Sequence, residues 1–222
     1  MFNKKRRLKY FLNGQLIEHY FRLAKGTLFN VCLSGNQYVT DKHFQYLEGI
    51  HTLSVGGCKR ITDSAFAHLT GIHTLSMVGC KQITDDAFVH LAGIHTLHIG
   101  ACKQITDKTF SYLSGIHTLY MSGCHQVTDH AFSHLVGIHS LHFAGCKQIT
   151  DDAFPYLSGI HKLSMGGCEN ITDNAFTYLT GIHTLSLGRC KQITDNAFIN
   201  LVGIHTLNMS YCTSITDNAF QY

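Results

Sequence analysis

Apolar residues recur along this chain with a period of 22 residues. Residues 71–92 read GIHTLSMVGCKQITDDAFVHLA, with apolar side chains at Ile72, Leu75, Met77, Cys80 and Ile83. The alternation from Leu75 to Met77 has a period of two, which predicts a short strand with one face turned inward. The same segment opens at Gly49, Gly71, Gly93, Gly115, Gly137, Gly159, Gly181 and Gly203, and a degenerate copy occupies residues 27–48.

The second half of each segment predicts a short helix. Thr84 and Asp85 form a helix N-cap pair, because short oxygen-bearing side chains satisfy the free N–H groups of a first turn. Phe88 and Leu91 follow at helical spacing, and Gly93 is expected to end the helix in the left-handed region. One unit is thus a strand, a turn and a short helix. It cannot bury its own apolar face, so identical units must stack with their strands parallel.

The spacing apolar-x-x-apolar-x-apolar-x-x-Cys-x-x-apolar resembles the leucine-rich repeat, L-x-x-L-x-L-x-x-N/C-x-x-L, over nine units from residue 27 to residue 222. The cysteine and the following I-T-D-x-A-F are similar to the cysteine-containing subclass found in F-box leucine-rich-repeat proteins. Units of 22 residues are shorter than is usual in that subclass, and no F-box is recognisable. The resemblance implies an α/β solenoid shaped as a horseshoe, with parallel strands on the concave face, short helices on the convex face, and a non-enzymatic role in protein–protein interaction.

Residues 1–26 differ in charge from the rest of the chain. This segment contains seven basic residues and one acidic residue, Glu18, so its net charge is +6. The whole chain has a net charge of +3, which leaves −3 for the remainder. Apolar positions from Leu12 to Ala24 fall on one helix face and predict a helix that caps the first coil. No apolar core of a signal peptide and no membrane-spanning run is present. The basic cluster of Lys4, Lys5, Arg6 and Arg7 is either a solvated, disordered tip or a nuclear-import, nucleic-acid or membrane contact.

Stacking turns every position of the unit into a column of identical residues. The cysteine column, with Asn36 in the first unit, is expected to hold buried, reduced thiols that bond the turn backbone. Neighbouring cysteines have poor geometry for a disulfide, and no C-x-x-C pair is present to start a zinc site. Free thiols in this number point to a cytoplasmic or nuclear protein. Cys32 lies off this column, on the concave side. The column comprises Cys58, Cys80, Cys102, Cys124, Cys146, Cys168, Cys190 and Cys212.

Three further columns carry ionisable groups. The histidines are expected to stack at the start of each strand with every ring bonded to backbone, while metal capture and pH sensing stay open as alternatives. Aspartates beside the capping threonines are read as helix caps. Lysines on the turn form a solvated edge or, less favourably, a surface for an anionic partner. The columns run through His51 to His205, Asp41 to Asp217, and Lys59, Lys81, Lys103, Lys147 and Lys191.

Differences between the copies indicate function better than their identities. The outward strand position is small and polar at both ends of the array, but it reads His98, Tyr120 and His142 in the middle, while Met121 and Phe143 are expected to point inward. Aromatic residues on an exposed strand face are typical interface anchors. These three residues are therefore the predicted binding site on the concave face.

The sequence favours a protein partner, with no small-molecule substrate, no cofactor and no catalysis. The alternatives are the substrate-recognition adaptor of a ubiquitin ligase whose F-box is supplied elsewhere, and a metal-binding or pH-sensing histidine-rich solenoid. The last strand, near residues 206–210, is an unprotected edge. It predicts either a homodimer through residues 203–222 or a natural chain that continues past Tyr222.

Overall fold

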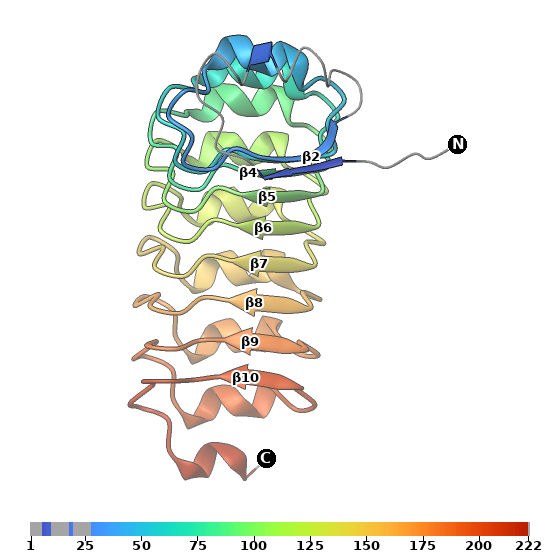
Figure 1. Cartoon of the computed structure of the whole chain (residues 1–222). Coiled ribbons are helices and arrows are strands. Elements are labelled where there is room, and N and C mark those ends of the chain that lie inside the picture. Colours follow the sequence, from blue (N-terminus) through green and yellow to red (C-terminus); the bar gives the residue numbers. More distant parts are fainter. Residues whose placement is uncertain (1–5, 10–17, 20–27, 222) are drawn as a thin grey trace, which may run out of the picture.

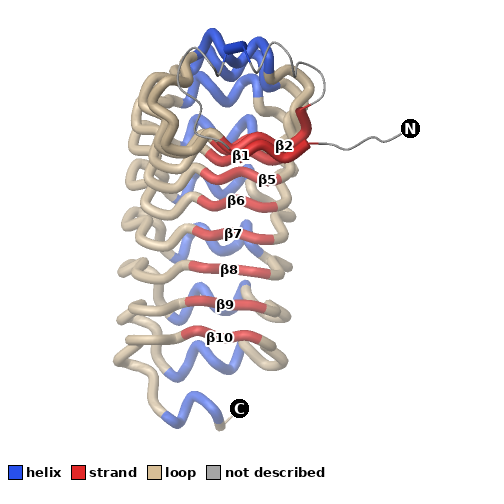
Figure 2. The backbone as a smooth tube through the Cα atoms, in the orientation of Figure 1, coloured by secondary structure: helices blue, strands red, loops and turns tan. Residues whose placement is uncertain are grey.

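The computed structural model describes residues 6–9, 18–19 and 28–221, and these residues form one stack of coils. Figure 1 shows the strands on one side of the stack and the helices on the other, and Figure 2 shows the same two layers in red and blue. The strands pair in chain order in a single ten-stranded sheet, and each pair is parallel. The predicted solenoid is confirmed.

Every strand from β3 onward is three residues long, and each coil carries one short 3₁₀ helix. The strands are β1 (Arg6–Lys9), β2 (Leu28–Cys32), β3 (Thr52–Ser54), β4 (Thr74–Ser76), β5 (Thr96–His98), β6 (Thr118–Tyr120), β7 (Ser140–His142), β8 (Lys162–Ser164), β9 (Thr184–Ser186) and β10 (Thr206–Asn208). The helices are η1 (Asp41–Tyr46), η2 (Asp63–Leu69), η3 (Asp85–His90), η4 (Asp107–Tyr112), η5 (Asp129–His134), η6 (Asp151–Leu157), η7 (Asp173–Tyr178), η8 (Asp195–Asn200) and η9 (Asp217–Phe220).

The register places identical residues side by side and so builds the core. Leu75 pairs with Leu53 on one side and with Leu97 on the other, and all three are fully buried. Met121 and Phe143 are also fully buried, as the alternation predicted. The strands show only one buried face because their other face points away from the helices. We use the name strand face for this outward surface, which is the predicted concave face.

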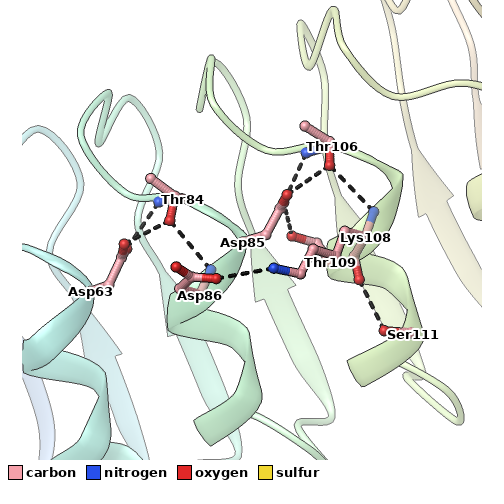
Figure 3. Close-up of polar contacts among 8 residues, drawn as sticks. All are labelled: Asp63, Thr84, Asp85, Asp86, Thr106, Lys108, Thr109 and Ser111. Carbon is pink, nitrogen blue, oxygen red and sulfur yellow. Dashed lines mark hydrogen bonds and ion pairs between the residues drawn. The ribbon is translucent and has the colours of Figure 1, made fainter.

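The aspartate column joins neighbouring coils, which the sequence did not predict. The helix cap is Thr84 itself, whose Oγ1 accepts the backbone N–H of Asp86 at 3.3 Å. Asp63 of the preceding coil accepts both the backbone N–H and the hydroxyl of Thr84, at 2.9 and 2.7 Å (Figure 3). The expectation that the aspartates serve as caps is therefore corrected, since their carboxylates bond the next coil.

The glycine that was expected to end each helix lies in a separate turn. Helix η3 ends at His90, and Gly93, with a φ of 80°, occupies a turn closed by the Ile94 N–H and the Leu91 carbonyl at 3.1 Å. In the equivalent turn after η2, Thr70 has φ −53° and ψ 129° before Gly71 at φ 79°, the dihedrals of a type II turn. The left-handed conformation was predicted correctly, but its place was not.

The two ends of the array differ. Strand β1 pairs with β2, with Arg7 beside Asn30 and Lys9 beside Cys32, so Arg6 and Arg7 belong to the sheet and not to a disordered tip. The predicted capping helix lies outside the described residues, apart from Glu18 and His19, which are helical. At the other end, β10 pairs with β9, and Leu207 and Met209 are partly exposed.

Candidate binding face

The strand face carries small polar residues along most of its length. Each strand presents two outward positions, occupied by Thr74 and Ser76 in β4, and strand pairing aligns these positions into two columns. The first column reads Asn30, Thr52, Thr74, Thr96, Thr118, Ser140, Lys162, Thr184 and Thr206. The second reads Cys32, Ser54, Ser76, His98, Tyr120, His142, Ser164, Ser186 and Asn208.

His98, Tyr120 and His142 form one continuous stack of rings, which we name the ring ridge. Strand pairing places them in adjacent register. The ring centroids of His98 and Tyr120 lie 4.1 Å apart and those of Tyr120 and His142 lie 4.2 Å apart, with interplanar angles of 13° and 14°. The structure thus brings together the three residues that the sequence selected. All three are half-buried and remain partly accessible from the strand face.

The two imidazoles of the ring ridge favour their neutral form. Burial lowers the pKa of His98, and burial, the positive charge of His98 and then that of Lys162 lower the pKa of His142. The Ser140 hydroxyl lies 3.4 Å from His142 Nε2. At neutral pH the ridge is therefore an uncharged, polar aromatic surface.

A second stack of rings, the histidine ladder, runs beside the strand face at the start of the strands. Its members are His51, His73, His95, His117, His139, His161, His183 and His205. Neighbouring ring centroids lie between 4.0 Å and 4.7 Å apart. Stacking at the strand start confirms the predicted position of this column.

The partners of the histidine ladder differ from the prediction. His73 Nδ1 bonds the Thr74 hydroxyl at 3.1 Å, and the same side-chain pair recurs in other coils, whereas bonds to backbone were expected. His161 is an exception, because Lys162 replaces the threonine and its buried Nδ1 has no partner. Burial, followed by the charges of neighbouring imidazoles, lowers the pKa of His73, His117 and His161.

The cysteine column is structural, as predicted. All nine cysteines are free thiols, and the eight in the column are buried, whereas Cys32 is partly exposed on the strand face. Cys124 Sγ donates to the Ile99 carbonyl of the preceding coil at 3.3 Å. Burial raises the pKa of Cys124 to about 12, so the thiol stays protonated. Asn36 instead accepts the N–H groups of Tyr38 and Val39 through its side-chain oxygen.

The remaining polar columns lie apart from the ring ridge. Within the described residues, no group of three or more histidine, cysteine, aspartate or glutamate side chains could hold a metal ion. His73 precedes strand β4 and Cys80 follows it, so the two side chains belong to opposite ends of the strand. The column lysines are exposed on the turns, and none forms an ion pair among the described residues: Lys59, Lys81, Lys103, Lys147 and Lys191. No helix in the described part of the chain is long and apolar enough to cross a membrane.

Lys162 is the residue of this face that sequence reasoning missed. It is the one charged side chain in the two columns of the strand face from β2 to β10. It pairs in register with Ser140 on β7 and is exposed. The signal was present in the sequence as a departure from threonine. Its possible role in binding was recognised only from its place on the strand next to the ring ridge.

The parallel coils, their inward leucines and their buried cysteines define a leucine-rich-repeat solenoid. More particularly, the chain belongs to the family of BspA-type leucine-rich-repeat regions, whose model matches six copies over residues 37–161 and 103–222. A comparison with curated proteins found no match.

Solved structures of the same fold come from different settings. The yeast Rad7–Elc1 complex contains a chain that is 17% identical with a TM-score of 0.67, and the alignment covers 90% of this chain and 66% of that one. An internalin (InlF) from Listeria monocytogenes is 19% identical with a TM-score of 0.67, covering 86% and 57%. The Drosophila Toll–Spatzle complex gives 13% identity and a TM-score of 0.69, covering 92% and 29%. At these identities the likeness shows the fold alone.

Proposed function

We propose that this protein is a non-enzymatic interaction module that binds a protein partner on its strand face, with His98, Tyr120 and His142 at the centre of the interface. This proposal rests on the ring ridge, which lies in the middle of a face whose other positions are mostly serine and threonine. Leucine-rich-repeat proteins are typically non-enzymatic scaffolds, which agrees with this role.

The ring ridge has the physical properties of an interface anchor. Aromatic side chains contribute much of the binding free energy at protein interfaces. Stacking already restricts the rotation of Tyr120 between its two neighbours, so binding would cost little additional side-chain entropy. The residues at the same position on either side, Ser76 and Ser164, are small, and the three rings stay partly accessible to a partner.

Affinity capture from an extract of the source cells tests this proposal. The tagged protein is compared with Tyr120→Ser, which installs the serine that Ser54, Ser76, Ser164 and Ser186 provide at this position in the coils outside the ring ridge. The matched control is Tyr178→Ser, because Tyr178 is a 40%-exposed tyrosine at the end of helix η7, away from the strand face. We expect partners that are retained by the control and lost from Tyr120→Ser. Partners that are retained equally by both variants would contradict the proposal.

A narrower version of this function is a substrate-recognition adaptor of a ubiquitin ligase whose F-box is supplied by another chain. The cysteine-containing repeat and the fold shared with the yeast Rad7–Elc1 complex support it. Co-purification of F-box or other ubiquitin-ligase subunits with the captured partners would distinguish an adaptor from a simple binding module.

The free thiols and the basic residues bear on where the protein acts. Nine unpaired cysteines fit a reducing compartment, so we place the protein in the cytoplasm or the nucleus. Contact with nucleic acid or a membrane through Lys4, Lys5, Arg6 and Arg7 is a less favoured role. Of the histidine alternatives, the stacked ladder supports pH sensing, whereas parallel rings do not converge on one metal ion.

We propose that the exposed C-terminal edge is covered either by a second copy of the chain, in a homodimer through residues 203–222, or by further residues of a natural chain that continues past Tyr222. Leu207 and Met209 are only partly buried, whereas the equivalent Leu185 and Leu187 of the preceding coil are fully buried. Pairing two such edges would cover both sets of apolar side chains.

A further inference from the structure

Five departures from the repeat consensus meet in one patch on strands β5 to β8. His98, Tyr120 and His142 depart from serine in one column, and Ser140 and Lys162 depart from threonine in the other. The register pairs Ser140 with Lys162 and His142 with Ser164, so these residues are neighbours on the same face. The other three departures in the two columns, Asn30, Cys32 and Asn208, lie on the terminal strands β2 and β10, so these five form one cluster inside the array.

Lys162 costs the histidine ladder a hydrogen bond. Thr74, Thr96, Thr118 and Thr184 each provide a hydroxyl to the ring nitrogen of the histidine before them. At Lys162 this hydroxyl is missing, and the buried Nδ1 of His161 has no partner. A residue that breaks a local rule of its own fold is a candidate for function, because binding and catalytic sites are where such exceptions gather.

The charge and shape beside His142 select the ligand. The ring of Tyr120 covers one side of His142, whereas the residue beside it on β8 is Ser164, which is too small to cover an imidazole face. The lysine on that strand, Lys162, has no ion pair among the described residues. A partner that stacks a flat group on His142 would therefore meet one uncompensated positive charge, with no carboxylate in the two columns of the face from β2 to β10.

We infer that the strand face binds an acidic segment of a protein partner, in which a carboxylate pairs with Lys162 and a planar side chain or peptide group stacks on the open side of His142. This inference rests on the proposed function and specifies the chemistry of the partner. Opposite charges across an interface add specificity and speed association. A peptide is favoured over a nucleic acid, because polyanions need several phosphate contacts and this face offers one fixed cation.

The length of the segment follows from the strand spacing. Neighbouring strands lie about 4.8 Å apart, so the distance from Ser76 on β4, across the ridge, to Ser164 on β8 is roughly 19 Å. An extended peptide of about six residues spans it. Val78, which is 44% exposed beside Ser76, gives the β4 end of this path an apolar character. The segment therefore has a polarity, with its acidic residue at the β8 end.

Selection from a phage-displayed library of random peptides about a dozen residues long tests the inference. We expect peptides enriched in Asp or Glu, whose binding is followed individually by fluorescence polarisation. Lys162→Thr should weaken them about five- to tenfold and remove most of their salt dependence. Lys191→Thr is the matched control, because it removes the same charge from an exposed turn away from the strand face. The threonine at 162 restores the ladder consensus, so the melting temperature should not fall.

The outcomes separate this inference from the proposed function. Peptides that need Tyr120 but show no acidic enrichment, or that bind Lys162→Thr as well as the wild type, overturn the inference alone. Peptides that bind Tyr120→Ser and Lys162→Thr as tightly as the wild type overturn both. A library that yields no binder overturns the peptide ligand, while the capture experiment still tests the face. If an oligothymidylate probe binds the wild type but not Lys162→Thr, the ligand of this face is a nucleic acid and the peptide inference is overturned.

Discussion

Asp85 accepts two hydrogen bonds from Thr106 of the following coil, from the backbone N–H at 2.9 Å and from the hydroxyl at 2.6 Å (Figure 3). The Thr109 hydroxyl adds a third bond to the same carboxylate at 2.5 Å. The Asp–Thr pair repeats from Asp41 to Asp195. Each pair links one coil to the next, so it contributes to the interface energy between neighbouring coils, on which the stability of a solenoid depends.

Removing one carboxylate of this column should destabilise the whole stack. Asp129→Ala would leave the N–H and hydroxyl of Thr150 without their acceptor, at a cost of about 1–3 kcal/mol in the free energy of unfolding. Urea denaturation measures this change. The control is Asp152→Ala, which removes an exposed carboxylate one position after Asp151 in the next helix. Equal effects of the two substitutions would show that the inter-coil bonds contribute little.

Truncation of two adjacent residues of strand β6 should have different effects on stability and on partner binding. Leu119 is fully buried, so Leu119→Ala should cost roughly 2–5 kcal/mol. Tyr120 is half-buried on the strand face, so Tyr120→Ala should leave the melting temperature nearly unchanged and should weaken partner binding by more than about 1 kcal/mol. Thermal unfolding of both variants checks the pair. A collapse in Tyr120→Ala would mean that the ring ridge serves the fold.

Stability should fall as the pH drops below 6.5. The pKa values of His73, His117 and His161 are lowered in the folded state by burial and neighbouring imidazoles, from an ordinary value of 6.5. Below that value the unfolded chain binds more protons, so acid favours unfolding, while the full stabilisation is present above it. Several histidines acting together should give a steeper loss than one could produce.

Urea midpoints at pH 7.5, 6.5 and 5.5 measure this dependence. His117→Gln should make it shallower, because one imidazole of the ladder is removed. His125→Gln, at an exposed turn position outside the ladder, is the control. A midpoint that does not change between pH 7.5 and 5.5 would rule out the ladder as a pH-sensitive element.

A glycine at position 101 should stabilise the protein. Ala101 has a φ of 60°, in the turn position where most coils carry glycine, such as Gly79 and Gly123. The left-handed region costs a residue with a Cβ about 1–2 kcal/mol, so Ala101→Gly should recover up to about 1 kcal/mol after the entropic cost of glycine. Ala144→Gly, one position earlier in a later turn, should instead be neutral or destabilising. Chemical denaturation distinguishes them.

The exposed edge of β10 should support self-association of the 222-residue chain, as the alternative to a longer natural chain that covers this edge with further residues. Sedimentation of the 24.8 kDa chain at micromolar concentration is expected to show a dimer. Leu207→Lys should shift it towards monomer, because a charge on β10 opposes pairing of the exposed edges. A wild-type chain that sediments as a monomer with an ordered final coil would contradict both the pairing and the need to cover this edge.

The sequence alone determined the repeat, the parallel stack, the inward leucines and the buried thiols. It could do so because an unbroken period of 22 residues converts every local pattern into a column, and one strand alternation then fixes which residues face the core. The ring ridge could be predicted from the sequence for the same reason. His98, Tyr120 and His142 occupy one phase of the repeat, so parallel register had to place them side by side.

Only the tertiary structure decided which neighbours those columns bond. The Asp63 carboxylate is far from Thr84 in the chain, and its local sequence is equally suited to capping its own helix, so the inter-coil bond could not be predicted. The same holds for the threonine hydroxyls that bond the histidine ladder. Sequence periodicity assigns a residue to a column, but hydrogen-bond partners depend on distances of a few ångströms between coils, which only the packed stack sets.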